Sequence, residues 1–237
     1  MSKLIYTKMD NWSNIIQFNL YPPTCFICDQ PGHNALDLCT ECLQELKPST
    51  HACPVCNIEL SAVSSICGRC LQRPPCFDHV FSLYRYEGIA QFLIKSLKFQ
   101  AKHSCARTIG HLMGQHFKTL EKLPDALIAV PLHPKRLKER GFNQAELIAQ
   151  HIHKELNIPL VSPDLTRIIN STSQTSLKAS ERRKNLKNAF CYEPSIELRS
   201  IAVIDDVVTT GSTANEIAKT LKKKGVQQVE IWAFARA

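Results

Sequence analysis

Apolar residues recur along the last two thirds of this 237-residue chain in patterns typical of alternating strands and helices. Short apolar runs predict strands at 80–84, 126–130, 158–161, 201–204 and 226–234. Apolar positions at helical spacing predict helices at 88–98, 103–120, 143–156 and after residue 213. Strands that alternate with helices are typical of a mainly parallel sheet flanked by helices, so the expected fold class is α/β.

The most informative segment is 201–213, where an apolar run leads directly into two carboxylates, Asp205 and Asp206. The run lacks period-2 alternation, as expected of a strand covered on both faces. Small residues rich in hydroxyl groups follow it: Thr209, Thr210, Gly211, Ser212 and Thr213. Open α/β sheets bind ligands at the carboxyl ends of their strands, and glycine permits close approach of the backbone to a ligand.

The helix expected after this segment has Thr213 and Glu216 at the spacing of a capping box. Its positive N-terminal end would face a phosphate held by the hydroxyl-rich loop. Each of two adjacent carboxylates accepts a hydrogen bond from one hydroxyl of a vicinal diol. The segment therefore predicts a site for a ribose that carries a 5′-phosphate.

Eight of the eleven cysteines form four C-x-x-C pairs, each separated from the next by ten residues. The pairs are Cys25 and Cys28, Cys39 and Cys42, Cys53 and Cys56, and Cys67 and Cys70. Four such pairs in even succession predict two structural Zn²⁺ ions, each held by four thiolates. Sequential pairing gives one site from the first four and one from the last four, and an interleaved cross-brace also fits the spacing. A disulfide framework is the weaker alternative because no secretory signal is evident.

These cysteines divide the chain into an N-terminal segment 1–24, a double zinc module 25–76 and an α/β domain 77–237. The proline-rich stretch 73–75 predicts the linker between the last two. A module of about 50 residues buries too little apolar surface to fold alone, so metal binding would supply folding free energy. No run of 18 apolar residues occurs, and we expect a soluble, cytoplasmic protein without a transmembrane segment.

The formal net charge of +8 is spread unevenly. Residues 77–237 carry 24 Lys and Arg against 15 Asp and Glu, a net charge of +9, whereas 25–76 has three against five. Residues 88–120 contain no acidic side chain, which suits a polyanion. Candidate nucleic-acid contacts in this stretch are Lys95, Lys98, Lys102 and Arg107.

Residues 201–213 resemble the PRPP motif of type I phosphoribosyltransferases along its whole length. With the four zinc knuckles and the sequence Arg-Gly-Phe-Asn-Gln at 140–144, the chain resembles the ComF/GntX family of competence-associated proteins. The resemblance extends to Arg167, Gln174, Leu177, Arg182, Asn185 and Phe190, in the stretch where phosphoribosyltransferases keep a flexible loop. It implies that Asp205 and Asp206 bind the ribose of PRPP and that 209–213 holds its 5′-phosphate.

The cationic segment 131–144 follows a predicted strand, and we expect it to be a loop suited to a pyrophosphate. By family position, the pyrophosphate would lie beside Lys135, Arg136 and Arg140. Mg²⁺ would accompany PRPP, held largely by the pyrophosphate and ribose oxygens.

Three functions fit these features. The resemblance implies a role in DNA uptake and natural transformation, with binding of single-stranded DNA and of PRPP or a related sugar phosphate. The alternative is an active phosphoribosyltransferase that uses an unidentified base or amine, although no segment that selects a base is evident. In the third, the acidic zinc module docks onto proteins of the DNA-uptake machinery, peripheral to the membrane.

Overall fold

A computed structural model describes residues 22–34, 36–60, 66–169 and 186–237. The chain forms two compact units, Met1–Leu46 and Lys47–Ala237. The described part of the first unit contains the short helix α2, Thr40–Gln44, and the first two cysteine knuckles. The second unit contains the other two knuckles and the whole α/β domain. Sequence motifs place the domain boundary at Cys76, whereas the second compact unit begins 30 residues earlier, at position 47.

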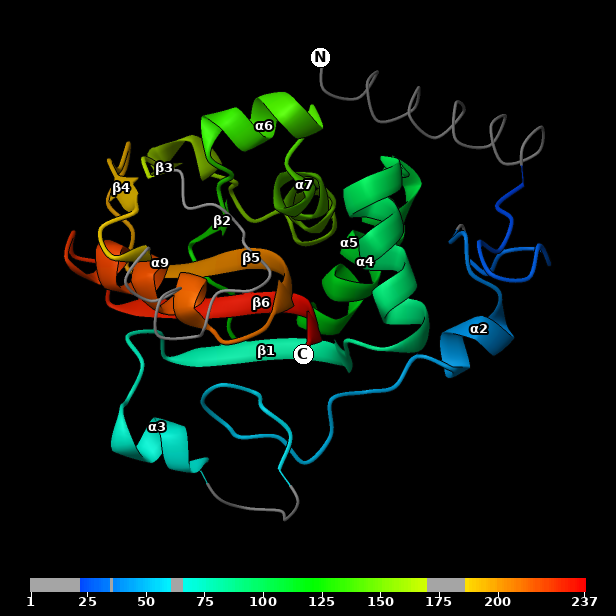
Figure 1. Ribbon diagram of the computed structural model, residues 1–237, viewed down its shortest axis with the longest axis horizontal. Coiled ribbons are helices and arrows are strands. Elements are labelled where there is room, and N and C mark those ends of the chain that lie inside the picture. Colours follow the sequence, from blue (N-terminus) through cyan, green and yellow to red (C-terminus); the bar gives the residue numbers. More distant parts are fainter. Residues whose placement is uncertain (1–21, 35, 61–65, 170–185) are drawn as a thin grey trace, which may run out of the picture. The chain divides into compact units, whose positions relative to one another are not determined.

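Four parallel strands form the central sheet of the second unit, in the order β1-β6-β5-β2. Their bounds are β1 His79–Arg85, β2 Ala126–Ala129, β5 Ser200–Val208 and β6 Gln228–Arg236. Residues Ile201–Ile204 of β5 are completely buried, because helices cover both faces of this strand. The α/β fold class is confirmed (Figure 1).

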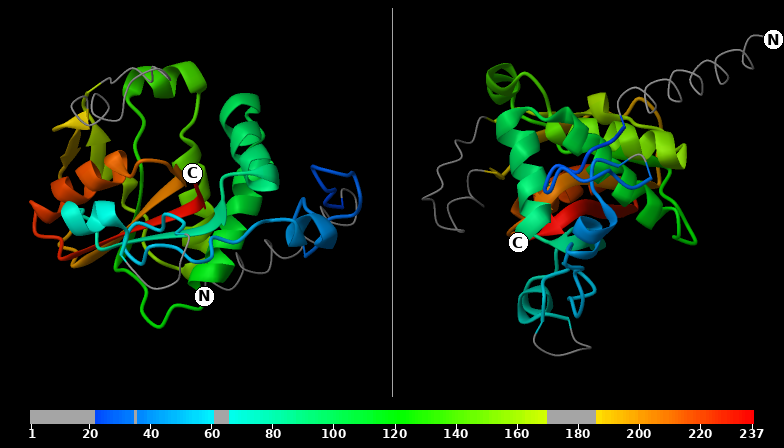
Figure 2. Two further views of the ribbon diagram at one scale, coloured as in Figure 1. Left: turned by 60° about the horizontal axis from the view of Figure 1, so that its bottom comes forward. Right: turned by 90° about the vertical axis from the view of Figure 1, so that its right-hand side faces the viewer.

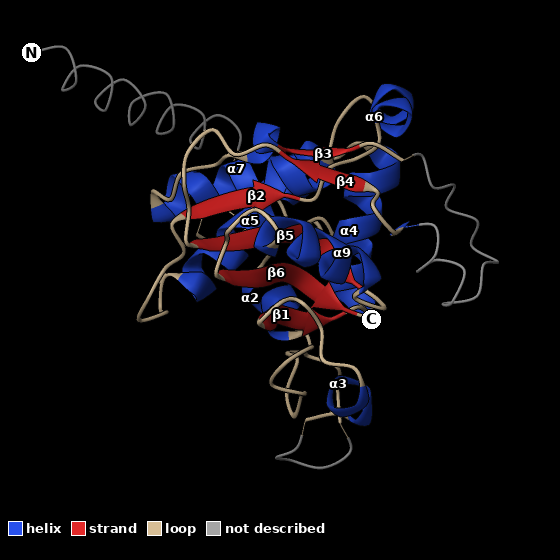
Figure 3. Ribbon diagram, turned by 90° about the vertical axis from the view of Figure 1, so that its left-hand side faces the viewer, coloured by secondary structure: helices blue, strands red, loops and turns tan. Residues whose placement is uncertain are grey.

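Among the described residues, helices α4, α5 and α7 lie on one face of the sheet and α9 lies on the other (Figures 1 and 3). Their bounds are α4 Gly88–Gln100, α5 His103–Phe117, α7 Gln144–Leu156 and α9 Ser212–Lys222. Helices α5 and α7 pack closely because α5 presents Gly110 and Gly114 to its neighbour. A Cβ atom at Gly110 would lie 2.5 Å from that of His151, and one at Gly114 would lie 2.8 Å from that of Glu155.

Shorter elements complete the described part of the second unit. Strands β3 Leu165–Arg167 and β4 Phe190–Tyr192 form a separate antiparallel pair after the 3₁₀ turn Ser162–Asp164. Helices α3 Gly68–Gln72 and α6 Pro134–Arg140 are each short. The strand predicted at 158–161 is only a single bridge between Leu160 and Leu127.

The segment from Lys47 to the third cysteine knuckle lies along the edge strand β1 (Figure 2). Ser49 N–H donates to the carbonyl of Leu83 at 2.9 Å, and Arg85 N–H donates to that of Lys47 at 2.9 Å. Further along, Val80 N–H donates to the carbonyl of Val55 at 2.9 Å. These bonds satisfy polar groups of an otherwise open sheet edge, so the second zinc ribbon is packed onto the sheet.

Some sequence predictions fall outside the described ranges. They include most of the segment 1–24 and four positions of the expected flexible loop: Gln174, Leu177, Arg182 and Asn185. Within the described ranges, no helix combines the length and apolarity needed to traverse a bilayer.

Candidate phosphoribosyl site and zinc centres

Eight of the described cysteines form two clusters, each suited to one zinc ion. Cys25, Cys28, Cys39 and Cys42 form one, and Cys53, Cys56, Cys67 and Cys70 form the other, with the sulfurs of each within 4.8 Å of one another. Sequential pairing, rather than a cross-brace, is therefore present. The Sγ atoms of Cys28 and Cys39 are 3.6 Å apart, as are those of Cys56 and Cys67. Tetrahedral Zn–S bonds of about 2.3 Å require sulfur separations of about 3.8 Å, so the clusters fit zinc.

Hydrogen bonds from the backbone lower the pKa of one thiol in each cluster. Burial raises the pKa of Cys53, but hydrogen bonds from the backbone of Cys67, Cys56 and Val55 outweigh it and lower the pKa to about 6. In the same cluster, burial and neighbouring sulfurs raise the pKa of Cys70. In the other cluster, the pKa of Cys25 is likewise lowered and that of Cys42 is raised. Because crowded thiolates repel one another, a cation is needed before all four can ionise.

The two adjacent carboxylates lie within β5 rather than beyond its end. Asp205 pairs in register with Ala233 of β6, and the strand continues to Val208. The β-branched Val207 and Val208 extend the strand past the point where the polar pair predicts its end. Asp205 is partly exposed, whereas Asp206 is only 1% exposed.

Lys98 of α4 forms an ion pair with the Oδ2 atom of Asp206. Both side chains are largely buried, at 19% and 2% exposure. Burial and the neighbouring Asp206 carboxylate raise the pKa of Asp205 well above its usual value, and Lys98 opposes that effect. Lys98, more than 100 positions earlier in the chain, is therefore a direct partner of the acidic pair.

The hydroxyl-rich loop leads from β5 into α9. Gly211 caps this helix with a left-handed backbone (φ 71°), and no side chain caps it. The capping box expected from Thr213 and Glu216 is wrong, since Glu216 accepts a hydrogen bond from Asn188 N–H at 2.8 Å. The hydroxyls of Thr210 and Ser212 lie 3.0 Å apart. The loop thus presents hydroxyls at a helix N-terminus, an arrangement that suits a phosphate.

The cationic segment after β2 is a helix, α6, and not the loop that its position and charge predict. His133 caps it by accepting from Lys135 N–H at 3.2 Å, Pro134 begins it, and Gly141 ends it in a left-handed conformation. Proline at the first helical position and glycine after the last are typical of helix ends. The positive charge of this segment does not by itself indicate a helix.

Arg136 and Arg140 of α6 line a cavity of about 400 Å³ together with Lys98 and Phe99. Arg140 lies close enough to Asp206 to be influenced by its charge, and it donates to Oε1 of Gln144 at 2.6 Å. Lys135 is exposed and does not line this cavity. Two of the three expected pyrophosphate residues are thus brought together with Lys98, beside the acidic pair.

The remaining residues of the Arg-Gly-Phe-Asn-Gln sequence join α6 to α7. Asn143 caps α7 by accepting from Ala145 N–H, and its Nδ2 donates to the carbonyl of Val130 at the end of β2. Phe142 makes an edge contact with the ring of His103. Asn143 therefore fixes the start of α7 against the end of β2.

Sequence reasoning did not assign Arg167 to the pyrophosphate region. Burial lowers the pKa of Arg167, and the charge of Arg136 lowers it further. The charges of Arg136 on α6 and Arg167 on β3 therefore influence each other. Phe190 of β4 is buried and lies under Arg167 at 5.8 Å.

The four candidate nucleic-acid contacts do not act alike in the structure. Lys95 and Lys102 are exposed, and Lys102 lies over the ring of Phe92 at 5.9 Å. Lys98 turns inward to Asp206, and Arg107 is partly buried on α5. Of the four, Lys95 on α4 and Lys102 at the start of α5 are therefore exposed.

Family comparisons agree with this architecture. Residues 17–72 match the model of the double zinc ribbon domain, and residues 97–237 match that of the phosphoribosyl transferase domain. The chain is 36% identical over 228 residues to Competence protein F of Haemophilus influenzae, covering 92% of this chain and 99% of that one. The chain belongs to the ComF family.

Other ComF relatives include DNA utilization protein YhgH of Escherichia coli K12, 34% identical over 223 residues, or 91% of this chain and 97% of that protein. Competence protein ComFC of Bacillus subtilis is 30% identical over 199 residues, 79% of each chain. Among solved structures, adenine phosphoribosyltransferase of Leishmania donovani shares 16% identity over 65% of this chain and 83% of that one. The TM-score of this match is 0.34.

Proposed function

We propose that this ComF protein acts in DNA uptake and natural transformation, binding single-stranded DNA and PRPP or a related sugar phosphate. The arrangement that carries the ligand proposal is the β5–α9 junction, where Asp205 and Asp206 precede the loop with Thr210 and Ser212. The names of its relatives, competence proteins and DNA utilization proteins, support the cellular role.

In the proposed complex the 5′-phosphate lies on 209–213 and the ribose hydroxyls face Asp205 and Asp206. Lys98 is paired with Asp206, so a diol reaches that carboxylate only after the ammonium group moves. The cavity shared with Arg136 and Arg140 offers Lys98 a second position, beside a pyrophosphate. Mg²⁺, carried by the oxygens of the ligand, would supply further positive charge there.

Calorimetric titration of the full chain with Mg²⁺–PRPP tests this arrangement. The double variant D205N/D206N is expected to bind at least tenfold more weakly, because a carboxylate accepts stronger hydrogen bonds from hydroxyls than an amide does. E193Q/E197Q, which removes two exposed carboxylates elsewhere, is the matched control. Equal affinity in all three proteins would reject the proposed ribose site.

The alternative is an active phosphoribosyltransferase, favoured by the three cations of the 400 Å³ cavity. In that reaction an acceptor nitrogen forms a bond to C1 of the ribose, and the C1–oxygen bond to pyrophosphate breaks with its electron pair. Lys98, Arg136 and Arg140 would stabilise the charge on the departing pyrophosphate. Following pyrophosphate release with PRPP, Mg²⁺ and a panel of bases and amines separates binding from turnover.

The proposal for single-stranded DNA depends on the exposed cations Lys95 of α4 and Lys102 at the start of α5. Replacing Lys95 and Lys102 with alanine in the full chain should reduce the salt dependence of oligonucleotide binding. The slope of the logarithm of the binding constant against the logarithm of salt concentration should be smaller by about 1.4, for two phosphate contacts. K223A/K224A removes two exposed lysines from the end of α9 as a control. If electrophoresis at moderate salt showed no retarded oligonucleotide complex, DNA binding would be rejected. The sugar-phosphate proposal would remain intact.

A further inference from the structure

A second, larger cavity lies between the second zinc ribbon and the hydroxyl-rich loop. Its volume is about 720 Å³, within the range of small-molecule sites. One wall is α3 with the residues that follow it, and the opposite wall is the start of α9. The floor is apolar, formed by Phe77, Val80 and Val208, which are all buried. Asp205 and Asp206 are not among its lining residues.

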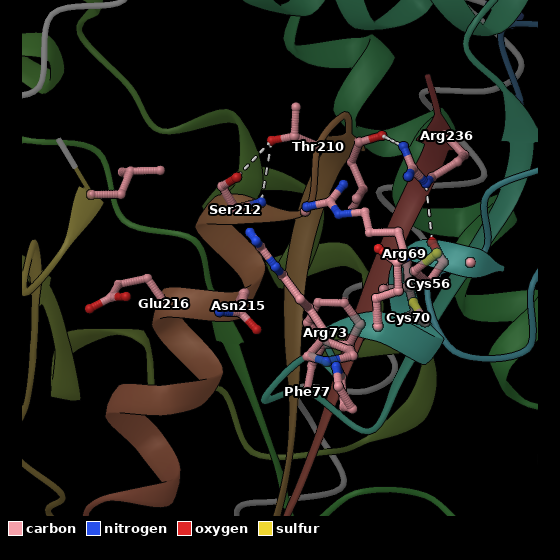
Figure 4. A pocket seen from close by; sticks show the side chains of 18 of the residues that line it. Cys56, Arg69, Cys70, Arg73, Phe77, Thr210, Ser212, Asn215, Glu216 and Arg236 are labelled. Carbon is pink, nitrogen blue, oxygen red and sulfur yellow. Dashed lines mark hydrogen bonds between the residues drawn. The ribbon is translucent and has the colours of Figure 1, made fainter. Parts of the chain in front are cut away.

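Two arginines of the zinc ribbon point into this cavity. Figure 4 shows the side chains of Arg69 and Arg73 extending toward the loop that carries Thr210 and Ser212. Within the described ranges, neither arginine forms an ion pair with a carboxylate. Glu216 is the one carboxylate among the described lining residues, and it already accepts a hydrogen bond from Asn188.

The zinc centre contributes to the net charge of the cavity walls. Zn²⁺ with four thiolates carries a net charge of −2, and two of those cysteines, Cys56 and Cys70, also line the cavity. The lining cations are Arg69, Arg73, Lys187 and Arg236. Four cations against one carboxylate and the zinc centre leave a positive surplus on the described walls. This surplus favours an anionic group between the arginines and the loop.

We propose that this cavity binds a nucleoside 5′-phosphate, either free or at the 5′ end of a DNA strand. Its phosphate accepts hydrogen bonds from Arg69, Arg73 and the hydroxyls of Thr210 and Ser212. Its base lies against the apolar floor, which suits a heterocycle and not a pyrophosphate. This nucleotide site uses the same loop as the proposed PRPP site, but it does not use Asp205 or Asp206. An experiment can therefore reject one site without rejecting the other.

Thymidine 5′-monophosphate and a hexathymidylate with or without a 5′-phosphate are the probes, titrated against the full zinc-loaded chain. The phosphorylated hexamer is expected to bind at least tenfold more tightly than its 5′-hydroxyl form. R69A/R73A should lose about tenfold or more of that affinity, whereas R69K/R73K should recover part of it. D205N/D206N should keep binding to these probes. Tighter binding of the hexamer than of the monophosphate would identify a strand end as the ligand, and equal binding a free nucleotide.

Several outcomes would overturn the proposal. They are equal affinity for the 5′-hydroxyl and 5′-phosphate hexamers, no binding of either phosphorylated probe, and equal losses in R69A/R73A and the charge-matched control K223A/K224A. If D205N/D206N lost as much affinity for the probes as R69A/R73A, the probes would be bound in the PRPP site instead. Zinc content is measured in parallel, and loss of one zinc from R69A/R73A would mean that the arginines serve to neutralise the thiolates.

Discussion

Arg236 donates from Nε to the carbonyl of Cys56, 3.1 Å away and 180 positions earlier in the chain. Its Nη1 also donates to the carbonyls of Val208, at 2.9 Å, and of Thr209. One buried guanidinium therefore connects the second zinc ribbon to the end of β5, where the hydroxyl-rich loop begins. Cys76 N–H adds a second link by donating to Oδ1 of Asn215 on α9 at 2.7 Å.

Replacing Arg236 with lysine should therefore uncouple the ribbon from the loop. A lysine cannot reproduce the planar fork of donors, so buried carbonyl groups lose their partners. We expect a decrease of about 2 to 4 kcal/mol in the free energy of unfolding, measured by urea denaturation. R199K, at an exposed arginine, should leave it unchanged. Equal stability of both variants would show that these hydrogen bonds contribute nothing.

The two zinc centres should differ in their effect on phosphate binding. C67S is expected to remove the second zinc and to weaken binding of ribose 5-phosphate about tenfold, because Cys56 and Arg236 no longer hold the loop. C28S should remove the first zinc, in the separate unit Met1–Leu46, with little effect on that affinity. Elemental analysis gives the zinc content and calorimetry the affinity. A loss of affinity in C28S alone would contradict the proposed coupling.

Asp205→Asn should stabilise the protein while removing a proposed ribose contact. The pKa of Asp205 is raised in the folded state, so its folded form binds the proton more tightly than the unfolded chain does. Its ionisation lowers stability as pH rises from the unfolded toward the folded pKa, and the penalty persists above both. We therefore expect a higher Tm for the variant at neutral pH, with the difference disappearing in acid. A lower Tm at neutral pH would contradict the assigned direction.

Lys98→Ala should destabilise the protein by about 3 kcal/mol, because it leaves the buried carboxylate of Asp206 without its cation. The double variant K98A/D206N should recover most of this loss, and a double-mutant cycle from thermal or urea unfolding measures the coupling. K95A, on the exposed side of the same helix, is the control. Additive effects of the two substitutions would show that the ion pair is not a stabilising contact.

The sequence predicted those parts of the site that are local. Four evenly spaced cysteine pairs were sufficient to predict two Cys₄ clusters, because each knuckle is built from four consecutive residues. The strand, acidic pair and hydroxyl-rich loop of 201–213 also lie in one continuous segment. By contrast, the helix α6 was missed, because its cations and flanking proline and glycine also suit a loop. The strand at 158–161 was predicted from its apolar residues, yet only one bridge forms there.

The sequence by itself determined the α/β fold class, the zinc ligands and the place of the acidic pair beside a phosphate-type loop, because short-range spacing encodes all three. Tertiary structure alone decided which cation faces Asp206, that Arg136 and Arg140 share a cavity with Lys98, and that the second ribbon packs along β1. These contacts join residues far apart in the chain. They follow from which sheet edge and helix face remain free after the core has packed, and no local pattern specifies that.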